Sequence, residues 1–153
     1  METLKAIARR KSTRAFSLEK QIAQTELNII LAAGCAAPVG RADYPSLHLT
    51  VVQDAETLDK INKTVQETLK SDQSLFYDAP VLVLVSASEQ QIAPNIQYAN
   101  AACIVENMLL AATDLGIGCV FLWGLPNVIA NNADLCEQLD FPNGFKPITA
   151  VAL

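Results

Sequence analysis

The chain has 153 residues, which fits a single domain, residues 1–153, with room for a substantial hydrophobic core. Hydrophobic residues make up 51% and charged residues only 18%, below the roughly 25% typical of soluble proteins, so we expect some apolar surface to meet a second copy in a homodimer. A net charge of −5, with Lys146 the only basic residue after Lys70, argues against a nucleic-acid face, and no apolar run reaches the roughly 20 residues of a membrane span.

Three helices and one strand are predicted in the first half of the chain. Helical spacing of apolar residues predicts helices over residues 3–10 and 17–34, the second ending near Gly34. Residues 48–53, HLTVVQ, are β-rich and predict a strand. Asp54 is expected to cap a third helix. The apolar stripe of that helix consists of Leu58, Ile61, Val65 and Leu69.

The second half is more apolar. Residues 80–87, PVLVLVSA, predict a strand buried on both faces. Pro94 is expected to open a long helix that ends at Leu115, with Gly116 as its stop. This helix is apolar nearly all round, which suits the centre of a fold or of a dimer. Two further strands are predicted over residues 119–124 and 148–153, and a short helix is predicted between them over residues 133–139.

The order of these elements limits the fold class. Helices and strands are mixed, and several strands are too far apart along the chain to form hairpins. We therefore expect an α+β or α/β fold with one sheet in three layers.

The stretch RRKSTRAF, residues 9–16, concentrates positive charge in an acidic chain. Four of the eleven Lys and Arg residues fall within six positions of it, next to two hydroxyl groups. The cations are Arg9, Arg10, Lys11 and Arg14, and the hydroxyls belong to Ser12 and Thr13. Fork-like donors beside a hydroxyl predict a site for one phosphate group. A solvated charged turn is the alternative.

Two further stretches could border a ligand. In LGIGCVFLWG the Gly-x-Gly follows a helix and leads into a strand, which is the reverse of a dinucleotide-binding fold. Gly124, directly after Trp123, lacks a side chain at a strand end, so a ligand could approach the main chain there. The loop AAPVG, residues 36–40, could lie against a flat ring, although composition alone favours an ordinary helix-to-strand connection.

No side-chain constellation for acid–base or nucleophilic catalysis is evident. The cysteines have no short spacing, and the chain has a single histidine, His48, so neither a zinc site nor a redox pair is predicted. The cysteines are Cys35, Cys103, Cys119 and Cys136. Reduced thiols suit a cytoplasmic protein. If the protein is an enzyme, we expect a cofactor to carry its chemistry.

Taken in order, these stretches resemble the nitroreductase family of FMN-dependent oxidoreductases over nearly the whole chain. The resemblance rests on RRKSTRAF, AAPVG with LHLTVV, YDAPVLVLVSA, ANAACIVENMLLAATDLGIGC with VFLWG, and GFKPITAVAL. It implies an α+β fold of three α/β/α layers around a mixed or antiparallel sheet. It also implies a homodimer with the long apolar helix in its interface and two FMN sites there.

The resemblance assigns the basic tract to one end of the FMN. Arg10 and Ser12 are implied to contact the phosphate, and Lys11 the phosphate or the ribityl chain. Arg14 is implied to lie near the pyrimidine edge of the flavin.

The other implied contacts border the ring system. Pro38, Val39 and Gly40 are implied to line it from the partner subunit. The main chain at Trp123 and Gly124 is implied to border the dimethylbenzene or N5 side.

The implied reaction is hydride transfer from NAD(P)H to nitroaromatics, quinones or similar small acceptors in a ping-pong cycle that needs no catalytic side chain. The alternatives are a flavin-binding carrier or sensor with little turnover, and a basic tract that docks an acidic partner or a membrane surface. The sequence leaves the choice between NADH and NADPH open.

Two departures from the family pattern affect these expectations. Ala42 stands where many members have an asparagine that contacts the flavin. The chain also ends at Leu153, where the family usually continues into an arm that embraces the partner and supplies another basic residue. We therefore expect a short member that lacks this arm, with weaker FMN binding and a less stable dimer.

Overall fold

The computed structural model describes residues 2–17 and 20–153 and contains, within them, four strands and six α-helices. The strands are β1 (Leu47–Val52), β2 (Leu82–Ser88), β3 (Val120–Leu122) and β4 (Phe145–Ala152). The helices are α1 (Thr3–Arg9), α2 (Gln24–Cys35), α3 (Ala55–Leu69), α4 (Ile96–Leu115), α5 (Gly124–Ala130) and α6 (Ala133–Gln138), with short 3-10 turns η1 (Gly40–Ala42) and η2 (Tyr44–Ser46). The strands form one sheet in the order β1-β2-β4-β3, and every neighbouring pair is antiparallel.

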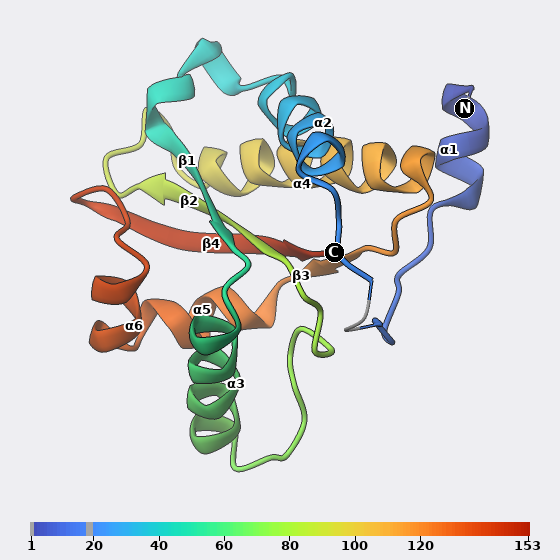
Figure 1. Cartoon of the computed structure of the whole chain (residues 1–153). Helices are drawn as coiled ribbons and strands as arrows, with labels where there is room; N and C mark the ends of the chain where they lie inside the picture. Colours follow the sequence, from blue (N-terminus) through green and yellow to red (C-terminus); the bar gives the residue numbers. More distant parts are fainter. Residues whose placement is uncertain (1, 18–19) are drawn as a thin grey trace.

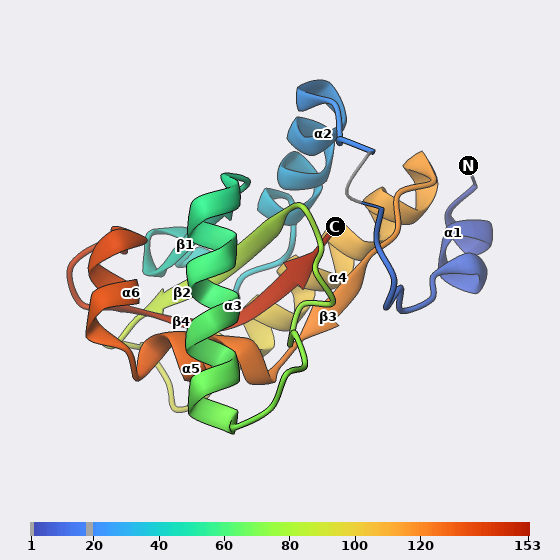
Figure 2. The ribbon, with the colours of Figure 1, turned by 60° about the horizontal axis from the view of Figure 1, so that its bottom comes forward.

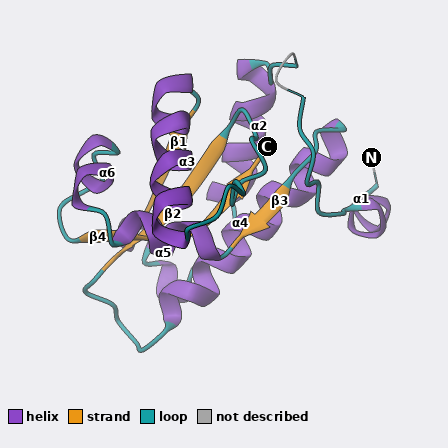
Figure 3. Cartoon of the chain, turned by 90° about the horizontal axis from the view of Figure 1, so that it is seen from below, coloured by secondary structure: helices purple, strands orange, loops and turns teal. Residues whose placement is uncertain are grey.

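Helices cover both faces of this sheet. α2 and α4 lie on one face, and α3, α5 and α6 lie on the other, while α1 stands apart beside the end of α4 (Figures 1 and 2). Seen from below, α3 crosses in front of the sheet (Figure 3). The predicted three-layer α+β architecture is confirmed, and the sheet is antiparallel rather than mixed.

Two cores sandwich the central strand β2. Val83 and Val85 belong to the core under α2 and α4, whereas Leu82 and Leu84 belong to the core over α3 and α5. All four side chains are fully buried. Because successive strand residues point to opposite faces, a strand covered on both sides must be apolar throughout, as the run in residues 80–87 predicted.

The predicted cap and stripe of α3 are confirmed in part. The carboxylate of Asp54 accepts a hydrogen bond from the main-chain N–H of Thr57 at 2.7 Å, and this bond lowers the pKa of Asp54. Ile61 and Val65 are fully buried. Leu69, in the last turn, is 47% exposed, so the inward stripe ends before it.

Close packing joins α2 to α4. A Cβ added at Gly34 would lie 2.9 Å from Cγ of Met108, so only a glycine lets the two helices come this close. Gly34 is therefore a packing residue in the last turn of α2, which ends at Cys35, near Gly34 as predicted.

Other helix boundaries differ from the prediction. The second helix begins at Gln24 rather than at residue 17, and residues 18–19 of the predicted span lie outside the described residues. At its start the Glu26 carboxylate accepts from the main-chain N–H of Ala23 at 3.0 Å. The long helix begins at Ile96 because Asn95 is left-handed, with φ 64°, and it stops before Gly116 as predicted.

Two strand boundaries were also misplaced. Residues 119–124 are a strand only over β3, because Trp123 adopts helical dihedrals and Gly124 opens α5, a helix that the sequence did not predict. The last strand starts at Phe145, and a register shift between Val85 and Ser86 accommodates Pro147 opposite Ser86.

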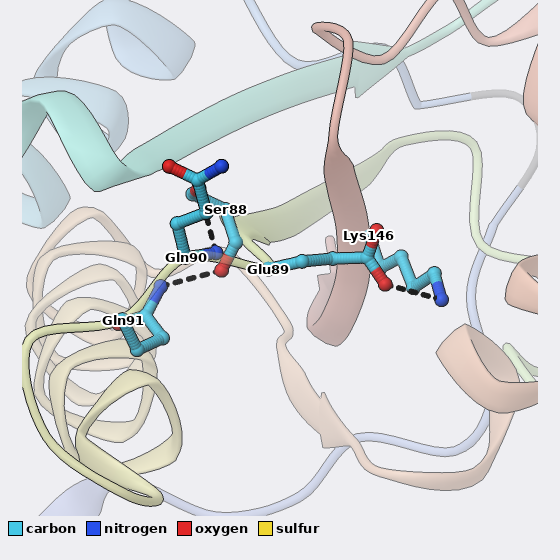
Figure 4. Close-up of polar contacts among 5 residues, drawn as sticks. All are labelled: Ser88, Glu89, Gln90, Gln91 and Lys146. Atoms are coloured by element: carbon cyan, nitrogen blue, oxygen red, sulfur yellow. Dashed lines mark hydrogen bonds and ion pairs between the residues drawn. The ribbon is translucent and has the colours of Figure 1, made fainter.

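Polar contacts stabilise the turn that follows β2 at Ser88. The side-chain amide of Gln91 donates to the carbonyl oxygen of Ser88 at 2.6 Å, and the Ser88 hydroxyl accepts from the N–H of Gln90 at 3.1 Å (Figure 4). Glu89 and Lys146 form an ion pair that joins this turn to β4 (Figure 4). Both charged side chains are exposed, so this pair adds little to stability.

A matched pair of substitutions in α3 tests the burial pattern. Ile61→Ala should lower the free energy of unfolding by about 2–5 kcal/mol, because it opens a cavity in a closed core. Leu69→Ala, in the same helix, should cost less than about 0.5 kcal/mol. Urea denaturation followed by circular dichroism measures both, and equal losses would contradict this packing.

Candidate functional site

The basic tract pairs with Cys119, the residue that directly precedes β3. Ser12 forms a parallel bridge with Cys119, and the N–H of Thr13 donates to the carbonyl oxygen of Cys119 at 2.9 Å. Burial raises the pKa of the Cys119 thiol, while the positive charge of Arg10 acts in the opposite sense, as expected for a guanidinium near this strand. The tract is thus ordered by the sheet.

The tract lines two different cavities, one with Lys11 and the other with Arg14. Alternate residues of an extended segment point in opposite directions, so we expect Arg10, Ser12 and Arg14 to share one side. Lys11 lies on the other side and lines a cavity of about 420 Å³ with Arg9, Thr13 and the turn between α4 and β3. The four tract residues of the predicted site are neighbours, but Lys11 approaches a ligand from a different direction than the other three.

The cations of the tract are not neutralised by ion pairs within the described part of the chain. The ion pairs seen among residues 2–17 and 20–153 join Lys5 to Glu2, Lys63 to Asp59 and Lys146 to Glu89, and they include none of the tract residues. Ser12 and Arg10 are half-buried, and Lys11 and Arg14 are exposed. A concentration of uncompensated positive charge beside a hydroxyl favours an anion.

Arg14 faces a loop, residues 72–78, to which the sequence assigned no part in the site. Its guanidinium carbon lies 5.9 Å from the centroid of the Tyr77 ring. A cavity of about 680 Å³ is lined by residues 14–16 of the tract and by residues 72–74, Tyr77 and Asp78 of this loop. Within this loop Tyr77 and Asp78 are both left-handed, with φ 58° and 56°, a conformation that is rare without glycine. No periodic signal in the sequence marks such a loop.

Open main chain and exposed aromatic rings meet at the end of β3. Trp123 is 58% exposed, and its ring centroid lies 5.9 Å from that of Tyr98 in α4. A Cβ added at Gly124 would meet nothing closer than Cδ1 of Leu75, at 3.9 Å. Because Leu75 and Tyr77 belong to one loop, residues 72–78 form a wall that runs from Arg14 to Gly124.

The loop at residues 38–40 lies elsewhere on the molecule. The N–H of Gly40 donates to the side-chain oxygen of buried Asn100 at 2.9 Å, and a Cβ at Gly40 would lie 2.4 Å from Cδ1 of Ile96. Cys119, which pairs with Ser12 of the tract, contacts Leu109 of α4. Leu109 lies nine residues after Asn100, or about 14 Å further along the helix at 1.5 Å per residue. The cavity beside Val39, about 330 Å³, is lined by α2, β1 and α4 and includes no tract residue.

A single chain therefore does not unite all nine predicted site residues. Arg10, Lys11, Ser12 and Arg14 gather at the start of β3, whose far end carries Trp123 and Gly124. Pro38, Val39 and Gly40 are held near the start of α4.

The described residues contain no group of three His, Cys, Asp or Glu side chains that could hold a metal ion. Their four cysteines are free thiols. The His48 ring packs edge-on against Phe145, with 6.5 Å between the centroids. Among the same residues, no helix combines the length and apolarity that crossing a bilayer requires.

Comparisons with known proteins identify the family. A model of the nitroreductase family matches residues 7–153, and the chain belongs to this family. A protein of Archaeoglobus fulgidus named as an NADH dehydrogenase/NAD(P)H nitroreductase is 31% identical over 99% of this chain and 84% of its own length.

Solved structures share the fold. The crystal structure of a Bacteroides fragilis nitroreductase with bound FMN has a TM-score of 0.85 and 31% identity, covering 99% of this chain and 87% of that one. A Desulfitobacterium hafniense nitroreductase with bound FMN has a TM-score of 0.87 and 24% identity, covering 98% of this chain and 86% of that one. The second likeness supports the fold alone.

The Asn100 contact can be tested directly. Asn100→Ala should lower the free energy of unfolding by about 1–3 kcal/mol, because it leaves the Gly40 N–H unpaired in a half-buried loop. The Gly40 amide should also exchange with deuterium faster, as measured by NMR. Asn131→Ala, which removes an exposed hydrogen bond, is the control and should change stability by less than about 0.5 kcal/mol. Unchanged Gly40 exchange would mean that Asn100 does not anchor this loop.

Proposed function

We propose that the protein binds FMN and transfers hydride from NAD(P)H to small acceptors such as nitroaromatics and quinones. The observation that carries this proposal is the cluster of donors without ion pairs, Arg10, Ser12 and Arg14, fixed at the start of β3, whose other end leads to the open main chain of Gly124. Membership of the nitroreductase family and the FMN-bound Bacteroides fragilis relative support it.

The residues at the start of β3 fit a phosphate group. A flavin phosphate is close to doubly charged and is held best by charge-assisted hydrogen bonds. Arg10 and Ser12 share one side of the tract, and Lys11 adds a cation from the other side. Among the residues described, neither Arg10 nor Lys11 forms an ion pair. The donor set therefore fits the phosphate end of FMN.

The far end of β3 fits a flat ring. From Cys119 to Leu122 the chain advances three residues, or about 10 Å at the rise of a strand, before it turns at Trp123 into α5, so the site has two separate ends, as an elongated ligand with a phosphate at one end requires. Gly124 leaves its main chain accessible, and Trp123 and Tyr98 offer aromatic surface beside it. Arg14 and residues 72–78 line the space between the two ends.

When bound, FMN supplies the hydride chemistry, and donor and acceptor would use the same site in turn, in a ping-pong cycle. The protein's own task is to hold the phosphate through Arg10 and Ser12 and to expose the main chain of Gly124 to the ring. Arg14 would place positive charge near the polar edge of the ring, which favours its reduced, anionic form. No acid–base side chain is required.

We further propose that the site is completed in a homodimer. Pro38, Val39 and Gly40 lie too far along α4 to reach the tract of their own chain, so they would reach the flavin of a second copy. Exposed apolar side chains on α1 and α2, Leu4, Ile7 and Ile29, provide surface that a partner could cover. The free thiols suit the reducing cytoplasm as its location.

One observation favours a second candidate, a flavin carrier or sensor with little turnover. Ala42 is left-handed, with φ 55°, and its methyl group offers no polar contact to a ligand. Such a site would hold flavin without fixing it for rapid hydride transfer. Bound flavin that neither NADH nor NADPH bleaches without oxygen would favour this candidate.

Trp123 provides a direct test of FMN binding, because it is the only tryptophan in the chain. Titration of the purified protein with FMN should quench its fluorescence and leave a yellow protein after gel filtration. Anaerobic NADH or NADPH should then bleach the flavin absorbance, and a quinone should restore it. A colourless protein with unquenched fluorescence would rule out the proposal.

Substitutions in the tract separate phosphate binding from ring binding. Arg10→Ala should weaken FMN about ten- to a hundredfold, because a hydrogen bond to a charged group is worth roughly 1.5–3 kcal/mol. Riboflavin, which lacks the phosphate, should bind as it does to the parent protein. Lys60→Ala, which removes an exposed cation from α3, is the control. If Arg10→Ala leaves FMN affinity unchanged, the tract serves another anion, such as an acidic partner or a membrane surface.

A further inference from the structure

Arg14 contacts an aromatic ring, that of Tyr77. Two carboxylates, Asp72 and Asp78, line the same cavity, yet neither forms an ion pair with Arg14. Instead, the guanidinium carbon lies 5.9 Å from the centroid of the Tyr77 ring, within cation–π distance. Arg14 is held by an aromatic ring where carboxylates were available.

The kind of contact decides what Arg14 can still bind. A guanidinium has five N–H donors in its plane, and a carboxylate partner would occupy two of them and cancel the charge. A cation–π contact engages the cation through the ring's electron-rich face and uses none of these hydrogen bonds. Arg14 therefore keeps its charge and its in-plane donors for a ligand in the cavity.

The loop is built to keep the Tyr77 ring in place. Phe76 is 3% exposed and anchors the loop in the core over α3 and α5, against which Tyr77 also packs. The Ser74 hydroxyl accepts from the N–H of Asp78 at 3.2 Å, and the Ser74 carbonyl accepts from the N–H of Tyr77 at 3.4 Å. These contacts hold Tyr77 and Asp78 left-handed, with φ 58° and 56°, although side chains disfavour that conformation.

We propose that Tyr77 is a positioning residue: its ring fixes Arg14 so that the guanidinium donates to the polar edge of the flavin ring. This inference rests on the proposed function. It extends the site to the loop at residues 72–78, which acts on the ligand indirectly, by fixing the position of Arg14. It assigns Arg10 to the phosphate and the Arg14–Tyr77 pair to the ring. The two ends of the ligand should therefore respond to different substitutions.

The test compares FMN with riboflavin, using quenching of Trp123 fluorescence to measure both affinities. Tyr77→Leu keeps apolar bulk but removes the aromatic face, and it should weaken FMN and riboflavin by the same factor, about three- to fivefold. Tyr77→Phe keeps the face and should stay within about twofold of the parent protein. Both replacements face the same left-handed backbone as tyrosine, so the strain is matched.

A double-substitution cycle and a redox measurement separate positioning from packing. In an Arg14→Ala background, Tyr77→Leu should have no further effect on either affinity. The reduction potential of bound FMN, measured by spectroelectrochemical titration, should fall in Tyr77→Leu and in Arg14→Ala and should be retained in Tyr77→Phe. Melting temperatures identify any variant that is unfolded, and Tyr77→Met replaces Tyr77→Leu if the latter does not fold.

The possible failures are distinct. A parent protein that does not bind FMN overturns the proposed function. If the parent protein binds FMN, two results overturn the role of Tyr77: an unchanged affinity and potential in Tyr77→Leu, or an equal loss with and without Arg14.

Discussion

The candidate site depends on one main-chain hydrogen bond, from the N–H of Thr13 to the carbonyl oxygen of Cys119. Without this bond and the adjoining bridge at Ser12, the basic tract would be a charged connection that follows α1. Paired with Cys119 it becomes an ordered row in which side chains alternate between two sides. Charge is thereby concentrated at one end of a strand, and the accessible main chain of Gly124 lies at the other.

The proposed ligand site draws on segments that are distant in sequence. The tract contributes charge, the end of β3 contributes exposed main chain, and residues 72–78 close the wall between them. The loop at residues 38–40 is anchored to the other end of α4 by Asn100. A long, nearly apolar helix thus separates the two groups of proposed site residues, which is the arrangement expected if each group serves a different copy of the chain.

Local patterns predicted much of the fold. The apolar run of β2, the Asp54 cap and the stop at Gly116 are each determined by neighbouring residues, so they could be read directly. α5 and the start of α2 could not, because Gly124 opens one helix and Ala23, which has no side-chain acceptor, precedes the other. The basic tract was visible from its charge, but its pairing with β3 and the contact between Arg14 and the loop at residues 72–78 join segments far apart along the chain.

The close approach at Gly34 links core packing to the geometry of a distant surface. α2 ends one residue later, and the loop at residues 36–40 continues directly from it. A larger side chain at this position would push α2 away from Met108 and would carry the loop outward with it. Replacing a helical glycine is a common route to thermal robustness, but here it would trade that gain against the position of the loop that we propose meets a second copy of the chain.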